Sequence, residues 1–285
     1  MRHFRKHLVT PAKIVVAALL AAILALAAGG AAAQPLRIAG SGANVGAIEM
    51  LATEFAKSHP GARFAPIQAV GTGSSIRAAA GRALDLALTS RPLSDAERAL
   101  GLVQIEYART PFVMVVSRKM ALDAISSAQL AELYAGKLTR WPEGARVRPV
   151  LRPADDGDIA ILKSLSPAVA RGLDEALRRP GMIVATTDRD ATEMAEKTSG
   201  AIAASTLGLI LAEGRAVKPL RLDGIEPSLE ALASGRYVHQ KRLFVVHGPQ
   251  PLPETAKRFI EFLGSAQAKA LFARTGHLVP PFAAR

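Results

Sequence analysis

The chain has 285 residues, a formal net charge of +12 at pH 7, and 49% hydrophobic residues. It contains no cysteine, which excludes disulfides and lipid attachment to a cysteine. Its basic residues are scattered and only 5% of its residues are aromatic, a composition that argues against nucleic-acid binding. The positive charge instead favours a small anionic ligand or an anionic membrane surface.

Residues 1–33 are predicted to be a secretory signal peptide. The apolar run 14–28 is followed by three alanines that offer a cleavage site. An uncleaved membrane anchor is the alternative, although the run is shorter than the roughly 20 residues of a membrane span. Removal of the four basic residues of this segment leaves a mature charge of +12 − 4 = +8. The segment predicts export to the periplasm. The four basic residues are Arg2, Arg5, Lys6 and Lys13.

The mature chain opens with a predicted strand at 36–39, a glycine-containing loop at 40–46, and a helix at 47–58. The loop does not fit the G-x-G-x-x-G dinucleotide pattern, because Val45 stands where the third glycine belongs. A strand followed by a donor-rich loop and a helix start is better suited to hold a small anion.

A second loop of this kind, GTGSS, occupies residues 71–75 between a predicted strand at 63–70 and a short helix that Gly81 ends. The next predicted strand, 84–88, leads into Thr89, Ser90 and Arg91, and Pro92 ends it. Hydroxyls, a helix N-terminus and a guanidinium form an anion-binding combination. A polar turn before a packing helix is the simpler alternative.

Strands and helices alternate along the rest of the chain, which predicts an α/β architecture with mainly parallel sheets. In such sheets, ligands bind beyond the carboxyl ends of the strands. Trp141 is predicted to pack a turn. The further strands are expected at 104–107, 111–117, 147–151, 200–204, 217–222 and 242–247, and the further helices at 94–100, 127–134, 158–165, 166–178, 187–197, 228–233, 253–263 and 265–275.

Four segments resemble the phosphate ABC transporter substrate-binding family, the phosphate members of the type II periplasmic binding proteins. They are IAGSGANVGAIEMLATEF, GTGSSIRAAAGRALDLALTSRPLSD, LYAGKLTRWPEG and the run SGAIAAS to LFVV at residues 199–246. The resemblance implies two lobes joined by crossover strands and closing on a ligand by a hinge motion. The implied lobes are 34–116 with the return segment 243–285, and 117–242.

The resemblance also implies a ligand site. The side chain of Asn44 and the backbone N–H of Val45 fall at ligand positions of the first lobe, and Arg152 matches the arginine of the second lobe. The remaining implied site residues are Thr72, Gly73, Ser74, Ser75, Ser90, Arg91, Asp156, Gly157 and Asp158.

The chain departs from the family pattern after Arg152, because Asp156 and Asp158 stand where serine and threonine are usual. Two like charges about 4 Å apart repel by about 4 kcal/mol at an effective dielectric constant of 20, so carboxylates beside phosphate are unfavourable. Three explanations remain open. The aspartates cap the following helix and face away, one of them is protonated and donates to phosphate, or the ligand is not phosphate.

The leading hypothesis is an exported solute-binding protein that captures phosphate or a similar oxyanion for the membrane subunits of an ABC importer. It would act as a monomer, without cofactor, metal or catalysis. The alternative is an exported sensor or interaction module of the same fold, in which an Arg152–Asp156 ion pair fills the anion site. An enzyme is the third hypothesis, but Ser74 and Ser75 lack the G-x-S-x-G setting of a nucleophile.

Overall fold

The computed structural model describes residues 34–280. The predicted signal peptide at 1–33 therefore lies outside the described residues. Between residues 34 and 280, no helix has the length and apolar character that a membrane crossing requires.

A nine-stranded sheet runs through the described chain in the order β2-β1-β3-β11-β4-β8-β6-β7, with β9 paired to β4. A separate two-stranded sheet pairs β10 with β5. The strands at each end of the large sheet are parallel, whereas β4 and β11 are antiparallel to their neighbours. The bounds are β1 Ile38–Gly40, β2 Gln68–Ala69, β3 Leu86–Thr89, β4 Val103–Ser117, β5 Ala124–Ile125, β6 Arg148–Leu151, β7 Ile183–Val184, β8 Ala201–Thr206, β9 Val217–Pro219, β10 Arg221–Leu222 and β11 Gln240–His247.

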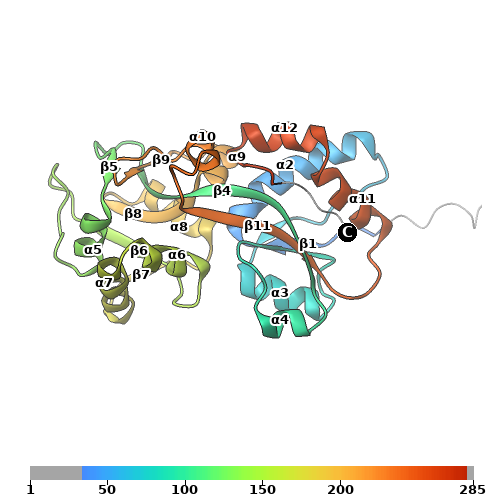
Figure 1. Cartoon of the computed structure of the whole chain (residues 1–285), viewed down its shortest axis with the longest axis horizontal. Coiled ribbons are helices and arrows are strands. Elements are labelled where there is room, and N and C mark those ends of the chain that lie inside the picture. The colour runs from blue at the N-terminus through green and yellow to red at the C-terminus, as the bar shows by residue number, and fades with distance from the viewer. Residues whose placement is uncertain (1–33, 281–285) are drawn as a thin grey trace, which may run out of the picture. The chain divides into compact units, whose positions relative to one another are not determined.

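Helices flank this sheet, so the predicted α/β class is confirmed (Figure 1). Serine and threonine side chains cap many of the helix starts, as their positions in the sequence indicate. The bounds are α2 Gly42–Ser58, α3 Thr72–Ala80, α4 Asp95–Ala99, α5 Ser127–Tyr134, α6 Gly157–Leu165, α7 Pro167–Arg178, α8 Asp188–Lys197, α9 Leu207–Glu213, α10 Leu229–Ala233, α11 Glu254–Leu263 and α12 Ala266–Arg274.

The long strands β4 and β11 lie side by side and connect the two ends of the sheet (Figure 1). The prediction of two separate strands at 104–107 and 111–117 is wrong, because β4 is continuous through Pro111. Pro111 faces Gln240 at the start of β11, and the pairing with β8 begins at the next residue. The missing N–H of Pro111 therefore falls where β4 changes partners and interrupts no continuous ladder.

Helices α2 and α3 begin earlier than the sequence indicates, so most of the two predicted glycine loops is helical. In α2 the glycines serve close packing. A Cβ on Gly42 would lie 2.9 Å from the amide nitrogen of Arg189, and one on Gly46 would lie 2.7 Å from Cγ of Glu213. Tertiary packing against α8 and α9 thus outweighs the low helix propensity of glycine.

Hydrophobic cores lie at both ends of the sheet. One packs α2, α11 and α12 around Phe55, whose ring meets that of Phe259 edge to face at 5.4 Å. The other includes Trp141, which is buried and donates from Nε1 to the carbonyl of Gly200 at 2.9 Å. The prediction that Trp141 packs a turn is confirmed.

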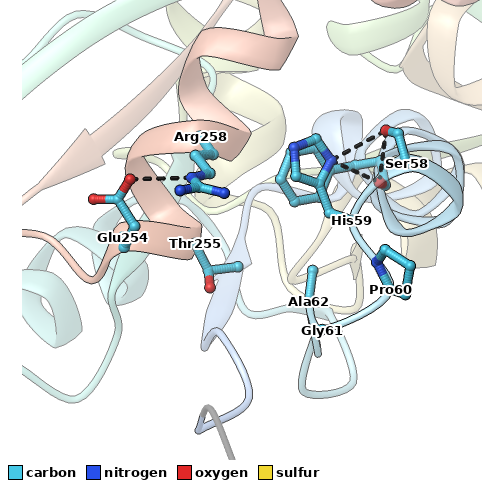
Figure 2. Close-up of a pocket in the computed structure, with 9 residues that line it drawn as sticks. Ser58, His59, Pro60, Gly61, Ala62, Glu254, Thr255 and Arg258 are labelled. Carbon is cyan, nitrogen blue, oxygen red and sulfur yellow. Dashed lines mark hydrogen bonds and ion pairs between the residues drawn. The ribbon is translucent and has the colours of Figure 1, made fainter.

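A surface pocket of about 390 Å³ lies between the end of α2 and the start of α11 (Figure 2). His59, which follows α2, stacks on Phe55 with ring centroids 3.9 Å apart. Arg258 and Glu254 form the other wall, where they are paired with each other at 3.0 Å. The polar groups of this pocket are thus largely bonded to each other.

Candidate functional site

The GTGSS loop and the residues that follow β3 lie together. Thr72 is the first residue of α3, and its Oγ1 lies 3.2 Å from Oγ of Ser90, which follows β3. The backbone N–H of Ser90 also donates to Thr72 Oγ1 at 3.2 Å. Within the described residues, no side chain caps the start of α3, because its N-cap is Gly71. The first turn of α3 therefore offers backbone donors beside two hydroxyls.

The other residues of the GTGSS loop differ in their surroundings. Ser75 is completely buried, and its hydroxyl donates to the carbonyl of Thr72 at 2.9 Å, a structural bond within the helix start. Ser74 is exposed and accepts from Arg77 at 3.2 Å. Gly73 is partly exposed. Ser75 is thus the one buried residue of this loop, and the other four lie near the surface.

Arg91 is engaged by Glu97 of α4, which accepts from both of its terminal nitrogens at 2.7 and 2.8 Å. This hydrogen bonding raises the pKa of Arg91, and the nearby charges of Asp155 and Asp156 raise it further. The same pairing lowers the pKa of Glu97 to about 2. The charge of Arg91 is thus already balanced by Glu97.

Asn44 and Val45 lie in the first turn of α2 and are completely buried. The hydroxyl of Tyr107 donates to Asn44 Oδ1. Asn44 Nδ2 has no hydrogen-bond partner among the described residues, so it is a spare buried donor. Val45 belongs to the core at this end of the sheet.

Arg152 follows β6 and is only 2% exposed. Its Nη1 donates to the carbonyl of Ala185 at 2.8 Å, and its Nη2 donates to Asp156 at 2.7 Å. Asp156 is the N-cap of α6 and accepts from the backbone N–H of Asp158 at 2.9 Å. Asp156 therefore caps the helix, but it does not face away as the first of the three explanations supposes, because it also pairs with Arg152. Gly157 is the first residue of α6.

Asp158 points inward and is completely buried, together with Lys241 of β11 and Asp188 of α8. Nζ of Lys241 contacts both carboxylates. The guanidinium of Arg152 lies 3.5 Å from Asp158 and 3.8 Å from Asp188. We call Arg152, Asp156, Asp158, Asp188 and Lys241 the buried charge cluster.

Lys241 and Asp188 were not among the site residues predicted from the sequence. One signal was available for Lys241, because residues at alternate positions of a strand share a face, and Lys241 alternates with Leu243 and Val245. A lysine on the inward face of an apolar strand requires a buried counter-charge. No sequence signal of this kind distinguished Asp188, because an acidic residue is ordinary in the first turn of a helix.

The formal charge of the buried charge cluster is −1, since two cations meet three carboxylates. Burial raises the pKa of Asp158 to about 7, despite the attraction of Lys241. Burial alone would lower the pKa of Lys241 and raise that of Asp188, but their mutual attraction reverses both shifts. Asp158 therefore takes up a proton more readily than Asp188, and its protonation makes the cluster neutral.

Helix N-termini converge on these carboxylates. Asp156 caps α6, Asp188 begins α8, and Ser41 at the N-cap of α2 donates its hydroxyl to Asp188 at 3.0 Å. The start of a helix stabilises negative charge, so each carboxylate lies where an anion is favoured. Among the described residues, no group of three or more possible ligands is arranged to hold a metal ion.

Comparison with known proteins assigns this fold to a family. The model of the PBP superfamily domain matches residues 26–267. The chain belongs to the PBP superfamily. No curated protein matches the sequence.

Solved structures similar to this PBP superfamily chain include a substrate-binding protein assigned to phosphate ABC transport from Clostridium perfringens, with bound phosphate. It is 20% identical over 87% of this chain and 100% of its own, with a TM-score of 0.74. An ABC-type phosphate transport receptor from Vibrio cholerae is 22% identical over 86% and 100%, with a TM-score of 0.61. A human phosphate-binding apolipoprotein is 13% identical over 86% and 91%, with a TM-score of 0.66. These likenesses establish the type II periplasmic binding protein fold.

Proposed function

We propose that this chain is a periplasmic solute-binding protein that captures phosphate or a related oxyanion for an ABC importer. Its lobes would be residues 34–116 with 243–285, and residues 117–242. The membership of the PBP superfamily and the likeness to structures of phosphate-transport proteins support this function. The protein would act as a monomer, deliver its ligand to membrane subunits and carry out no catalysis.

The observation that carries the proposal is the hydroxyl pair at the start of α3. Thr72 Oγ1 accepts the N–H of Ser90, so its own proton is available for Ser90 Oγ. The hydroxyl proton of Ser90 is then free to donate to a third group. Together with the uncapped amides of α3, this arrangement suits an oxygen atom that carries negative charge.

The charges around the site restrict the form of the oxyanion. Arg152 already donates to Asp156, so an anion that binds Arg152 must displace this carboxylate or approach it closely. Like-charge repulsion then favours an oxyanion of low charge, or one that binds when Asp158 is protonated. The affinity would therefore increase as the pH falls through about 7, the pKa of Asp158.

Calorimetric titration with phosphate tests the proposal, and Thr72→Val provides the decisive variant. Valine keeps the shape of threonine but removes the oxygen that organises Ser90, so we expect binding at least fivefold weaker. Ser164→Ala is the matched control, because Ser164 is exposed and donates only to the carbonyl one turn earlier. Equal phosphate affinity of Thr72→Val and the wild type would exclude this site.

A thermal-shift panel compares oxyanions with the alternative ligands, which are amines and divalent cations. Oxyanions should raise the melting temperature, because a ligand stabilises the folded state that it binds. Stabilisation by amines or divalent cations, without any by phosphate or sulfate, would instead support the exported sensor or interaction module.

A further inference from the structure

Asp188 connects the two ends of the sheet. It begins α8, which packs on β8, yet its carboxylate accepts from Ser41 at the start of α2, which packs on β1. A Cβ added to Gly42 would lie 3.2 Å from Cβ of Asp188, so the side chain lies directly against the first turn of α2. This is the position at a helix N-terminus where an external anion would be stabilised.

Lys241 offsets the free-energy cost of burying the carboxylates of Asp158 and Asp188. An unpaired buried carboxylate costs several kcal/mol, and Asp158 and Asp188 are both completely buried. Lys241 comes from β11, one of the two strands that connect the ends of the sheet, and contacts both carboxylates. Its pKa is raised, so it stays charged.

A backbone carbonyl and three carboxylates hold the side chain of Arg152 in place. Its three nitrogens face the carbonyl of Ala185 and three carboxylates, and the side chain is almost completely buried. An arginine fixed in this way loses little side-chain entropy when it meets a ligand.

We propose that Asp188 and Lys241 are positioning residues of the oxyanion site, which hold Arg152 in place and join the two ends of the sheet before any solute arrives. Asp188 takes the place of an external anion at the start of α2. The role of Arg152 rests on the proposed function, whereas the joining of the two ends does not depend on which solute binds.

The test variants must not leave a buried charge without its partner. Removal of Lys241 alone would leave two buried carboxylates without their cation, and that variant could fail to fold for this reason. Asp188→Asn combined with Lys241→Met removes one charge of each sign and keeps the formal charge of the cluster at −1. Ser41→Ala is a milder second variant, because it removes only the bond between Asp188 and α2.

Glu49→Gln is the matched control. Glu49 of α2 pairs with Arg189 of α8 at 3.0 Å, so this exposed ion pair connects the same two helices without entering the cluster. Exposed pairs contribute little to stability, and we expect this variant to behave as the wild type.

The experiment uses the absence of cysteine in the chain, which allows spin labels at two chosen sites. Ala99→Cys on α4 and Arg171→Cys on α7 are exposed positions that report on the two ends of the sheet. Pulsed electron paramagnetic resonance then measures the distance between the labels with and without phosphate.

In the wild-type background we expect one distance that phosphate leaves nearly unchanged. Without phosphate, the double variant should add a longer distance, Ser41→Ala should add a smaller share of it, and Glu49→Gln should add none. A single wild-type distance in the unliganded double variant would overturn the proposal. If the longer distance appears but phosphate does not remove it, the ligand assignment fails while the joining role stands.

Discussion

The hydroxyl of Ser41 donates to the carboxylate of Asp188 at 3.0 Å, although 147 positions separate the two residues in the chain. Ser41 occupies the N-cap position of α2, the first helix after β1, and Asp188 begins α8, the helix after β7. The bond therefore places an internal anion at the start of α2. Under the function proposed above, an external oxyanion would connect the two ends of the sheet, whereas this bond makes such a connection with a side chain of the protein itself.

Asp158 should make the stability of the protein depend on pH. Its pKa of about 7 in the folded chain lies above the value of about 3.9 expected for an unfolded chain. The folded state thus holds a proton that the unfolded state has lost, and the free energy of unfolding falls as the pH rises from about 4 to about 7. The slope from this group is at most about 1.4 kcal/mol per pH unit.

Urea unfolding at a series of pH values measures this effect. Asp158→Asn should remove this part of the slope, because asparagine has no proton to lose in this range. Asp155→Asn, at the exposed position in the same loop, should leave the slope as it is in the wild type. A constant stability difference between the wild type and Asp158→Asn from pH 4 to pH 7 would contradict the assignment.

Glu97 should contribute stability that disappears in acid. Its pKa is lowered to about 2, so its contribution is complete above about pH 4.3 and is lost as the pH falls through about 2. Glu97 pairs with Arg91 and accepts from the backbone N–H of Ser94, where it completes a capping box. Glu97→Gln should lower the free energy of unfolding by about 1 kcal/mol at pH 7.

Chemical denaturation of the Glu97→Gln variant at pH 7 and at pH 3 tests this prediction. The difference from the wild type should be smaller at the lower pH. Glu254→Gln removes a more exposed glutamate that also pairs with an arginine, and it should cost less. A loss that is the same at both pH values would show that the charge of Glu97 is not its source.

Tyr107→Phe should destabilise the start of α2. The Tyr107 hydroxyl and Asn44 Oδ1 are both completely buried and bonded to each other. Phenylalanine would leave the Asn44 carbonyl oxygen without its donor, at a cost of about 1–3 kcal/mol. The double variant with Asn44→Ala should cost less than the sum of the two single variants in equilibrium unfolding, because the bond is already lost. Simple additivity would argue against this pair.

Gly200→Ala should be strongly destabilising, and Gly144→Ala provides the comparison. Both glycines have a positive φ, of 72° and 90° respectively, so alanine strains the backbone at each site. Only at Gly200 would the new Cβ also lie 2.1 Å from a backbone atom, the carbonyl oxygen of Arg146. Thermal unfolding should show a clearly larger loss for Gly200→Ala. Equal losses would mean that the backbone near Trp141 shifts to make room.

Much of the fold could be predicted from the sequence because its signals are local. Alternating apolar runs and serine or threonine caps indicate the elements of an α/β protein, and the GTGSS loop and Ser90 lie at strand ends as expected. Local signals failed at Pro111, where a separate strand was predicted to begin, and at Gly42 and Gly46, where a loop was predicted. In each case a neighbouring element supplied the contacts that decided the local conformation.

By itself, the sequence determined the α/β class, the position of Arg152 after a strand and the two aspartates beside it. Only the tertiary structure decided which charges meet, because Asp188 and Lys241 join the buried charge cluster from elements far apart in the chain. Electrostatic energy depends on distance in space and on burial, and neither quantity follows from local sequence patterns. The same two aspartates therefore became a helix cap in one case and a completely buried counter-charge in the other.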